Sequence, residues 1–308
     1  MSDVLCIGQA VVDCITYGLD EDSLQGKAGR AQSITLSTGG DALNESIILS
    51  RLGYDVKIMA FLGEDPAGRL ILDTLEKEGV DTSLCDVKRG RDSVVADILA
   101  KKDGSRKSVS SRAALLEGAV LDLSLVKDAK ILSLASLFRA PLDDPKTVLS
   151  LVKKAKEEGM WISADTKVPI HKKIGMREFK DVFPYLDILF PNETEASYLT
   201  GFDVTEDPEK AADFFLNAGV RRIVLKLGAK GSLYKDIEHC ILLPPSNGEV
   251  IDTTGAGDNY VAGFLSGVLD GQPVEECLNR AFLASSIAIR SLGAHSGIRE
   301  KSQILEMV

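Results

Sequence analysis

Short apolar runs rich in β-branched residues alternate with longer amphipathic stretches, and this alternation restricts the fold more than any other feature of the chain. An apolar run of about four to eight residues predicts a buried strand, and an amphipathic stretch between two runs predicts a helix. Strands and helices that alternate in this way form mostly parallel sheets. The predicted strands are residues 4–8, 56–63, 130–136, 160–165, 186–192 and 222–228. We therefore expect an α/β fold with a mostly parallel central sheet flanked by helices.

Two of the amphipathic stretches carry the start and stop signals of helices. Residues 66–79 begin with a proline, which is favoured in the first helical turn, and end at Gly79. Residues 207–219 begin at Asp207, whose side chain can cap a helix, and end at Gly219. We expect a helix in each stretch.

Two other segments, residues 13–38 and 93–111, interrupt this pattern because their apolar and polar side chains alternate. The Asp103–Gly104 pair in the second segment is a strong signal for a tight hairpin turn. We expect antiparallel strands from both segments that together form one small discontinuous β lid, inserted in the α/β body. Ordinary hairpins at the edge of the sheet are the alternative interpretation.

Charge and cysteine content exclude several classes of function. With 36 basic and 46 acidic residues the chain has a net charge of −10, so we expect neither nucleic acid nor a membrane as a partner. The five cysteines are scattered without C-x-x-C spacing, which indicates neither a disulfide framework nor a zinc site. The N-terminal residues lack the basic and apolar regions of a signal peptide, and no apolar run approaches the roughly 18 residues of a membrane helix. We therefore expect a soluble, cytoplasmic protein.

The segment IDTTGAGDNYVAGFLSGVLDG, residues 251–271, combines a glycine turn with the start of a helix. From Asp258 onward apolar residues recur at helical spacing, which places the start of the helix at about Gly257 and its end before Gly271. Backbone N–H groups in such a turn can approach an anion closely, and the helix dipole favours negative charge there. A phosphate is therefore a candidate ligand of this turn.

Asp258 has no Lys or Arg beside it in the sequence, and two interpretations of its carboxylate are open. It can be an acid that stabilises the helix dipole by ~0.3–1 kcal/mol. Alternatively, a carboxylate beside a bound phosphate can accept a proton from an attacking hydroxyl. The glycine turn alone favours the first interpretation, and the rest of the sequence favours the second.

Motifs along the whole chain support the second interpretation. DTTGAGDNYVAGF (252–264) resembles the second signature of the ribokinase-like (PfkB) carbohydrate kinases, and GGDALNESIILSRLGYDVKIMAFLG (39–63) resembles the first. GQAVVD, GEDPAGR, PNETEA and LKLGAKGS follow in the order and spacing of the same family, and none of them has the spacing of a Walker A loop. The resemblance implies a ribokinase-like fold over residues 1–308 and an ATP-dependent sugar kinase.

The resemblance also implies roles for individual residues. Asp258 would deprotonate a sugar hydroxyl, which then attacks the γ-phosphate of ATP, and backbone N–H groups would form the anion hole. Asn192 and Glu195 match the family motif that positions Mg²⁺ through water, although by spacing alone they form a helix capping box, and both interpretations can hold together. The residues of the anion hole are Gly255, Ala256 and Gly257.

For ATP, the resemblance assigns contacts to Asn192, Lys226, Gly228, Gly231, Gly255 and Gly257. Without a nucleotide, Gly228 and Gly231 would form a turn between a strand and a hairpin. Residues 279–293 resemble the helix that walls the adenine, and their small residues Ala284, Ser285 and Ala288 leave room for a flat base or for close helix packing. Some family members bind a monovalent cation near the first aspartate of the glycine turn, which makes Asp252 a candidate K⁺ site.

For the sugar, Asp13, Gly39, Gly40, Asp41 and Asn44 match family positions that face the substrate. A carboxylate at Asp13, after the first strand, can accept hydrogen bonds from two vicinal hydroxyls. Asn44 shares a helical face with Ile47 and Ile48, so its amide is expected to point inward, where it needs a partner in the ligand or the backbone.

The identity of the sugar stays open. GGDALN is similar to the motif of 2-keto-3-deoxygluconate kinases, and Arg112 lies where acid-sugar kinases supply a cation suited to a carboxylate. However, DTKVPI (165–170) departs from the family's D-P-N-x-R, and Arg112 is equally a surface residue after a basic hairpin. We therefore leave neutral sugars and sugar acids as alternatives.

Two further expectations concern class and assembly. The competing hypothesis is a catalytically silent sugar- or nucleoside-binding regulator on the same fold, which the intact Gly-Ala-Gly-Asp and Asn-x-x-Glu motifs disfavour. A dinucleotide oxidoreductase needs a glycine fingerprint after the first strand, and GQAVVD supplies one glycine. Lids in this family often pair between subunits and the strands of 93–111 would leave an open edge, so we expect a homodimer through the lid.

Overall fold

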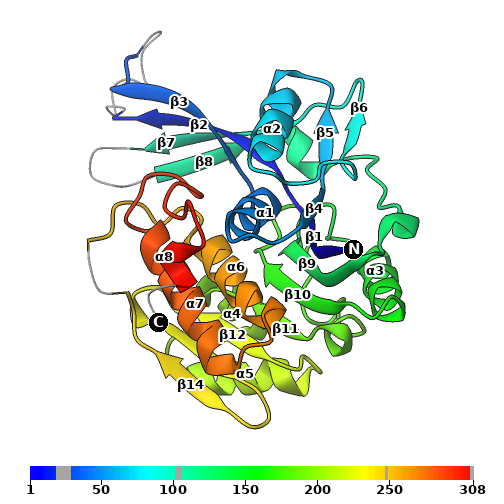
Figure 1. The fold of residues 1–308 in the computed structure, drawn as a ribbon, viewed down its shortest axis with the longest axis vertical. Helices are drawn as coiled ribbons and strands as arrows, with labels where there is room; N and C mark the ends of the chain where they lie inside the picture. Colours follow the sequence, from blue (N-terminus) through cyan, green and yellow to red (C-terminus); the bar gives the residue numbers. More distant parts are fainter. Residues whose placement is uncertain (19–28, 101–105, 247–248, 306–308) are drawn as a thin grey trace.

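The computed structural model describes residues 1–18, 29–100, 106–246 and 249–305. Within these residues the body of the protein is an eight-stranded sheet with helices on both faces (Figure 1). In spatial order the strands are β14 (Cys240–Leu243), β13 (Ser232–Lys235), β12 (Ile223–Lys226), β11 (Ile188–Phe190), β10 (Trp161–Thr166), β9 (Ala129–Leu137), β1 (Ser2–Ile7) and β4 (Val56–Met59). Neighbours from β12 to β4 pair in parallel, and β13 and β14 continue the sheet antiparallel. The prediction of a mostly parallel sheet is confirmed.

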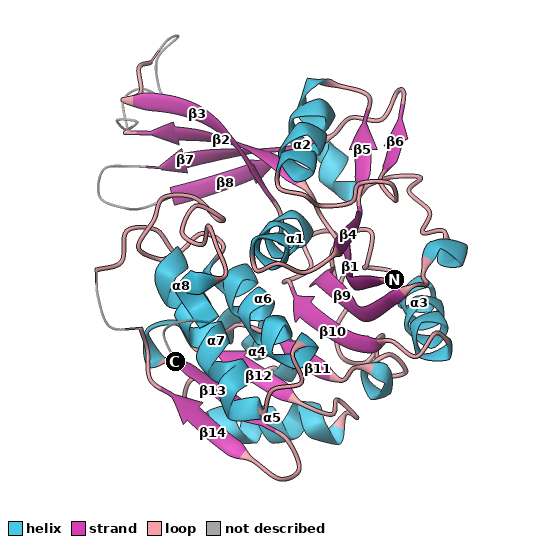
Figure 2. Cartoon of the chain, viewed as in Figure 1, coloured by secondary structure: helices cyan, strands magenta, loops and turns pink. Residues whose placement is uncertain are grey.

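Two groups of helices bury the two faces of this sheet in separate cores (Figure 2). One core contains α1 (Asp41–Arg51), α2 (Pro66–Lys77), α6 (Ala256–Leu269) and α7 (Val274–Ala288), and the other contains α3 (Pro145–Glu157), α4 (Glu193–Thr200) and α5 (Pro208–Asn217). A short helix, α8 (Ser302–Leu305), follows α7, and the 3-10 turns are η2 (Arg112–Leu115), η3 (Leu123–Leu125), η4 (Phe183–Tyr185) and η5 (Gly228–Lys230). No helix in the described ranges is long and apolar enough to span a bilayer. All five cysteines lie in these ranges and are free thiols.

The two helices expected from start and stop signals are confirmed as α2 and α5. Each begins with a proline after an aspartate cap: Asp65 accepts a hydrogen bond from the N–H of Gly68 at 2.7 Å, and Asp207 from that of Lys210 at 3.0 Å. Such a cap satisfies an N–H group that has no partner within the helix.

The prediction of a single strand over residues 56–63 is wrong. The segment divides at Ala60 into β4 and a separate strand, β5 (Phe61–Gly63), which pairs in parallel with β6 (Asp86–Lys88) in a two-stranded sheet. The pairing of β4 with β1 ends at Met59 opposite Ile7, the last residue of β1. Beyond that point the chain has no neighbour in the large sheet and takes a new partner.

A four-stranded sheet projects from the body at the upper left of Figure 1. Its order is β3 (Ser33–Gly39), β2 (Val11–Tyr17), β7 (Val94–Ala100) and β8 (Arg106–Ser110). We expected antiparallel strands, but β2 and β7 pair in parallel, because both begin next to the body, where Val94 is buried in a core and Val11 packs against it, and both run outward. β2 with β3, and β7 with β8, pair antiparallel. The expected Asp103–Gly104 turn lies outside the described residues.

Candidate functional site

Two helices begin at the rim of the sheet where the parallel strands end. α1 follows Gly40 and α6 follows Gly255, and these two glycines have φ values of 94° and 73°. A Cβ on Gly255 would also lie 2.5 Å from the carbonyl oxygen of Ala294. Glycine therefore permits both the backbone conformation and the close approach. The second helix begins at Ala256, one residue before the start expected from its apolar spacing.

A cavity of about 1080 Å³ lies over these two helix starts. On one side it is lined by Asp13, Gly40, Asp41 and Asn44, and on the other by Asn192, Lys226, Gly228, Gly231 and the turn from Gly255 to Asp258. The fold thus brings together most of the residues that the sequence singled out. Cavities of this size hold small-molecule ligands, and N–H groups at two helix starts favour an anion.

Three of the expected residues support this lining from behind. A Cβ on Gly39 would lie 2.4 Å from Oδ2 of Asp13, so the glycine makes room for that carboxylate. The carboxylate of Asp252 accepts hydrogen bonds from the N–H groups of Thr254 at 2.9 Å and Gly293 at 3.0 Å. Asp252 thereby ties the glycine turn to the segment that follows α7. Glu195, the third, helps to build the start of α4 as part of its helix cap.

The expectation that Arg112 faces the substrate is wrong. Arg112 is the first residue of η2. Its side chain is 82% exposed and pairs with Glu117 at 2.9 Å. Arg112 lines neither this cavity nor the second cavity described below. An exposed ion pair of this kind contributes roughly 0–1 kcal/mol, so the residue has the properties of an ordinary surface arginine.

Asp258 lies in the first turn of α6 and is 5% exposed. Its Oδ2 accepts a hydrogen bond from Nδ2 of Asn44 at 2.6 Å, which joins the starts of α1 and α6. Burial, reinforced by the carboxylate of Asp41, raises the pKa of Asp258 to about 6, while Lys167 and Asn44 act in the opposite direction. The prediction that Asn44 points inward is confirmed. A carboxylate that titrates near neutrality is suited to accept a proton from a substrate.

Two lining residues, Asp165 and Lys167, were missed as site residues from the sequence. Both oxygens of Asp165 lie 2.8 Å from Nζ of Lys226, and Nζ of Lys167 lies 3.1 Å from Oδ1 of Asp41. Burial alone lowers the pKa of Lys167, but the carboxylates of Asp41, Asp258 and Asp165 outweigh it and raise that pKa well above its usual range. The signal that could have found both residues is their position at the end of the predicted strand 160–165, where Asp165 is the last residue and Lys167 follows two residues later, since ligands bind at the carboxyl ends of parallel strands.

Lys226 places a second cation against the glycine turn. Its Nζ would lie 3.1 Å from a Cβ on Gly257, so the amine lies close to the first turn of α6. The ion pair with Asp165 is almost fully buried and fixes the lysine side chain in that position. A positive charge and several N–H groups therefore surround the same point of the cavity, which is suited to a phosphate.

The Asn192 and Glu195 pair forms the predicted capping box at the start of α4. Each side chain accepts a hydrogen bond from the backbone N–H of the other at 2.9 Å, and Oε2 of Glu195 also accepts from Thr166 Oγ1 at 2.9 Å. In the described part of the chain no three acidic, histidine or cysteine side chains are grouped to hold a metal by themselves. The hard oxygen donors present fit a Mg²⁺ that keeps several waters and is bound mainly through a substrate phosphate.

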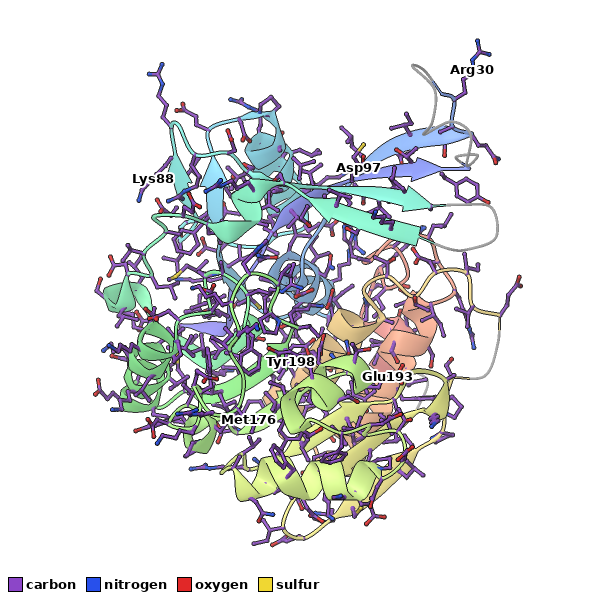
Figure 3. All side chains as sticks on the ribbon, turned by 180° about the vertical axis from the view of Figure 1, so that it is seen from behind. Arg30, Lys88, Asp97, Met176, Glu193 and Tyr198 are labelled. Atoms are coloured by element: carbon purple, nitrogen blue, oxygen red, sulfur yellow. The ribbon has the colours of Figure 1, made fainter. Side chains whose placement is uncertain are left out.

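Another part of the cavity is mostly apolar and is built by α7 and the residue that follows it. Phe282, Ser285 and Ile289 line it, whereas Ala284 is buried against α6, where its Cβ would lie 2.9 Å from a Cβ on Gly263. Ala288 is 1% exposed and lies in the interior. The small residues of 279–293 thus have two different roles. Ser285 faces the cavity, whereas Ala284 and Ala288 permit close helix packing. Figure 3 labels Glu193 of α4, which also lines the cavity.

Comparison with known sequences gives one consistent result. The sequence model described as pfkB family carbohydrate kinase matches residues 1–301. Ribokinase of Haemophilus influenzae is 26% identical over 289 residues, which cover 92% of this chain and 91% of that protein. An uncharacterized sugar kinase of Archaeoglobus fulgidus is 30% identical over 256 residues, which cover 81% of this chain and 97% of that protein.

Solved structures with the same fold include two ribokinases. The Arabidopsis thaliana ribokinase complexed with ribose and ATP superposes with a TM-score of 0.86 at 25% identity, covering 99% of this chain and 98% of that one. The ribokinase of Thermotoga maritima has a TM-score of 0.82 at 23% identity, with the same coverage of 99% and 98%. The similarity therefore extends over the eight-stranded and four-stranded sheets and all the helices that build the cavity.

Proposed function

The chain belongs to the pfkB family of carbohydrate kinases, and on that premise we propose that it transfers the γ-phosphate of ATP to a hydroxyl of a monosaccharide or sugar acid. Asp258 is the general base. The observation that carries this proposal is a buried carboxylate of raised pKa in the first turn of α6, beside a glycine turn and two lysines. The Arabidopsis relative, solved with ribose and ATP, supports a pentose among the first sugars to test.

The acceptor hydroxyl lies against Asp258 in this proposal. Asn44 binds Oδ2 of the carboxylate, so Oδ1 takes the proton of the hydroxyl as its oxygen attacks the γ-phosphorus and ADP leaves. Asp13 and Asp41 accept hydrogen bonds from the other hydroxyls of the sugar. Oδ1 of Asn44 is buried without a partner among the described residues and is available to a hydroxyl donor. A positioned base of this kind contributes roughly 10²- to 10⁴-fold in rate.

The charge on the transferred phosphoryl group meets the N–H groups of Gly255, Ala256 and Gly257 together with Lys226 and Lys167. These donors are already oriented by the start of α6 and by the buried ion pair with Asp165, so they need no rearrangement during transfer. Loss of one such donor typically costs about 2.7–4 kcal/mol of transition-state stabilisation. The apolar end at Phe282 and Ile289 accommodates the adenine.

Magnesium supplies charge neutralisation on the phosphate oxygens when it is bound with ATP, and Asn192 and Glu195 would hold it through water. Potassium activation through the segment of Asp252 is also part of the proposal. Turnover in KCl compared with NaCl at equal ionic strength tests it: a rise in KCl supports a cation site, and equal rates contradict one.

The four-stranded sheet is proposed as a lid over the acceptor, built from residues 13–38 and 93–111, and as a dimer interface. Leu36, Cys14, Asp97 and Val109 are paired in one row across β3, β2, β7 and β8. They share one face, and Asp13, next to Cys14, points to the other. Ile34, Leu36 and Val109 are 67%, 65% and 54% exposed, an apolar surface on the side away from the substrate. Figure 3 labels Asp97 on this sheet.

The experiment that tests the kinase proposal measures ATP consumption with Mg²⁺ across pentoses, hexoses, ketohexoses, nucleosides, aldonic acids and ketodeoxy acids. Turnover with at least one sugar, absent in Asp258→Asn, supports it. Binding of ATP and sugar without turnover by the unmodified protein would instead indicate the silent regulator.

A further inference from the structure

A second cavity, of about 530 Å³, lies at the same rim of the sheet and shares no described lining residue with the first. It is built by the segments that follow three adjacent strands: Gln9 after β1, Arg139 after β9, and Pro169 and His171 after β10. The ATP-side residues of the first cavity follow β12, which is three strands from β9 in the sheet. The second cavity therefore adjoins the acceptor end of the site rather than the nucleotide end.

Contacts tie Arg139 closely to the acceptor residues. Its Nε donates to the carbonyl oxygen of Val168 at 2.6 Å. Lys167, the residue before Val168, pairs with Asp41. Its backbone N–H donates to the carbonyl of Ser136, whose hydroxyl donates to Oδ2 of Asp41 at 2.9 Å. Two paths of contacts thus connect Arg139 with Asp41, and the carboxylate of Asp41 also acts to raise the pKa of Arg139, so the guanidinium lies within electrostatic range of the acceptor residues.

Arg139 has no acidic partner among the residues that the structure describes, although three acidic residues line the same cavity. Within the described ranges no carboxylate lies within ion-pair distance of its guanidinium, and Nε makes its one side-chain hydrogen bond. The acids of the lining are occupied: Asp143 pairs with Lys172 at 2.7 Å, Glu117 with Arg112 at 2.9 Å, and Asp144 caps α3.

Because the guanidinium of Arg139 is partly buried, its lack of an ion-pair partner among the described residues indicates an anionic ligand. Burial lowers the pKa of Arg139, and the more distant carboxylates of Asp41 and Glu195 only oppose that effect. A guanidinium held partly out of water without a counter-ion is unfavourable unless a ligand completes it. With Nε used by Val168, the two terminal nitrogens stay available, and their fork matches two oxygens of a carboxylate or phosphate.

We propose that this cavity is the subsite for an anionic group of the acceptor, and that Arg139 binds that group through Nη1 and Nη2. The proposal rests on the kinase function proposed above and narrows its substrate class to sugar acids or sugar phosphates. The cavity has room for the anion together with the carbon chain that carries it. Arg139 thereby takes the role that the sequence suggested for Arg112.

The test compares matched acceptors: an aldose, its aldonic acid, a ketodeoxy acid and a sugar phosphate with a free hydroxyl. We expect the unmodified protein to have a higher kcat/KM for an anionic acceptor than for its neutral counterpart. Arg139→Met should raise KM for that acceptor about 10- to 100-fold, with kcat and the neutral acceptors little changed. Arg139→Lys should restore part of the loss, and the matched surface variant Arg112→Met should have no effect. Comparison of the two sugar acids with the sugar phosphate decides whether a carboxylate or a phosphate is bound.

Equal KM values for anionic acceptors in the unmodified protein and Arg139→Met would overturn the proposal, as would a nucleoside as the preferred acceptor. Calorimetric titration of anionic sugars into Asp258→Asn, with and without Arg139→Lys, provides a readout that needs no catalysis. Binding that weakens with Arg139→Lys supports the subsite even if no sugar is phosphorylated, and binding that does not change refutes it even if the kinase function holds.

Discussion

In the proposed mechanism, the carboxylate of Asp258 sets the pH dependence of the reaction, a prediction at the scale of single residues. Its pKa is raised to about 6, and a base must be deprotonated, so kcat/KM should fall about tenfold per pH unit below that value. Because the charge of Lys167 lowers this pKa, Lys167→Gln should move the acid limb to higher pH. The exposed Lys130→Gln should leave it in place. A profile that stays flat down to pH 5 would show that Asp258 is not the base.

The buried carboxyl group of Glu45 should make the free energy of unfolding depend on pH, independently of the reaction. It is fully buried on α1, where Ser133 donates to its Oε2 at 2.5 Å, and Oε1 has no partner among the described residues. Burial raises its pKa well above the usual range. Between the unfolded and folded pKa values the folded protein binds the extra proton, so its stability falls as pH rises, by up to about 1.4 kcal/mol per unit. Urea unfolding from pH 5 to 8 should show a shallower decline for Glu45→Gln, and parallel curves would contradict this.

Sequence was informative at this scale wherever a residue belongs to a continuous motif. Asp258 and Asn44 could be singled out because each lies in a glycine-containing helix start. Asp165 and Lys167 could not be connected with them, because their contacts with Lys226 and Asp41 depend on which strands are neighbours. Arg112 was misplaced because local sequence does not fix the direction in which the first residue of η2 points.

The turn before α6 is the most constrained element of the site. Gly255→Ala should lower the free energy of unfolding by about 1–3 kcal/mol and abolish turnover, because alanine is disfavoured at φ 73° and its Cβ would meet the oxygen of Ala294 at 2.5 Å. Gly175→Ala, where nothing lies within 4 Å of the added Cβ, is the matched control. Chemical denaturation of both variants measures the difference, and equal stabilities would mean that the turn tolerates a side chain.

At the scale of elements, helices with caps and terminal glycines were predictable from the sequence. Strands whose bounds and direction depend on their partners in the sheet were less predictable. The start signals and the terminal glycines predicted both α2 and α5 correctly. The break between β4 and β5 was missed because it depends on where β1 ends, and the parallel pairing of β2 with β7 depends on how both strands leave the body.

At the scale of the whole molecule, the exposed apolar face of the four-stranded sheet predicts association. We expect a dimer in sedimentation velocity at micromolar concentration, and Leu36→Lys should shift it to a monomer because a charge would be buried in the interface. Ile237→Lys introduces the same change at a residue that is 92% exposed in the body, and this variant should stay dimeric. A monomer for the unmodified chain, or dissociation by both variants, would exclude this interface.

The class of the fold followed from the alternation of strands and helices, since that pattern permits few architectures. The order of the strands, and hence the meeting of β1, β9 and β10 around the second cavity, is a property of the folded chain. This is why the sequence indicated the nucleotide end, acceptor residues such as Asp13 and Asn44, and the proposed general base, but not Arg139.

Phosphoryl transfer that depends on Asp258 is the central claim, and product analysis tests it most directly. The measurement is mass spectrometry of the sugar after incubation with Mg²⁺-ATP, for Asp258→Asn and for Asp73→Asn, an exposed aspartate on α2. We expect a phosphorylated sugar at the unmodified rate from Asp73→Asn and a rate at least about 10²-fold lower from Asp258→Asn, which should stay folded because asparagine still accepts the hydrogen bond of Asn44. Phosphorylated product from Asp258→Asn within a few-fold of the unmodified rate would contradict the claim.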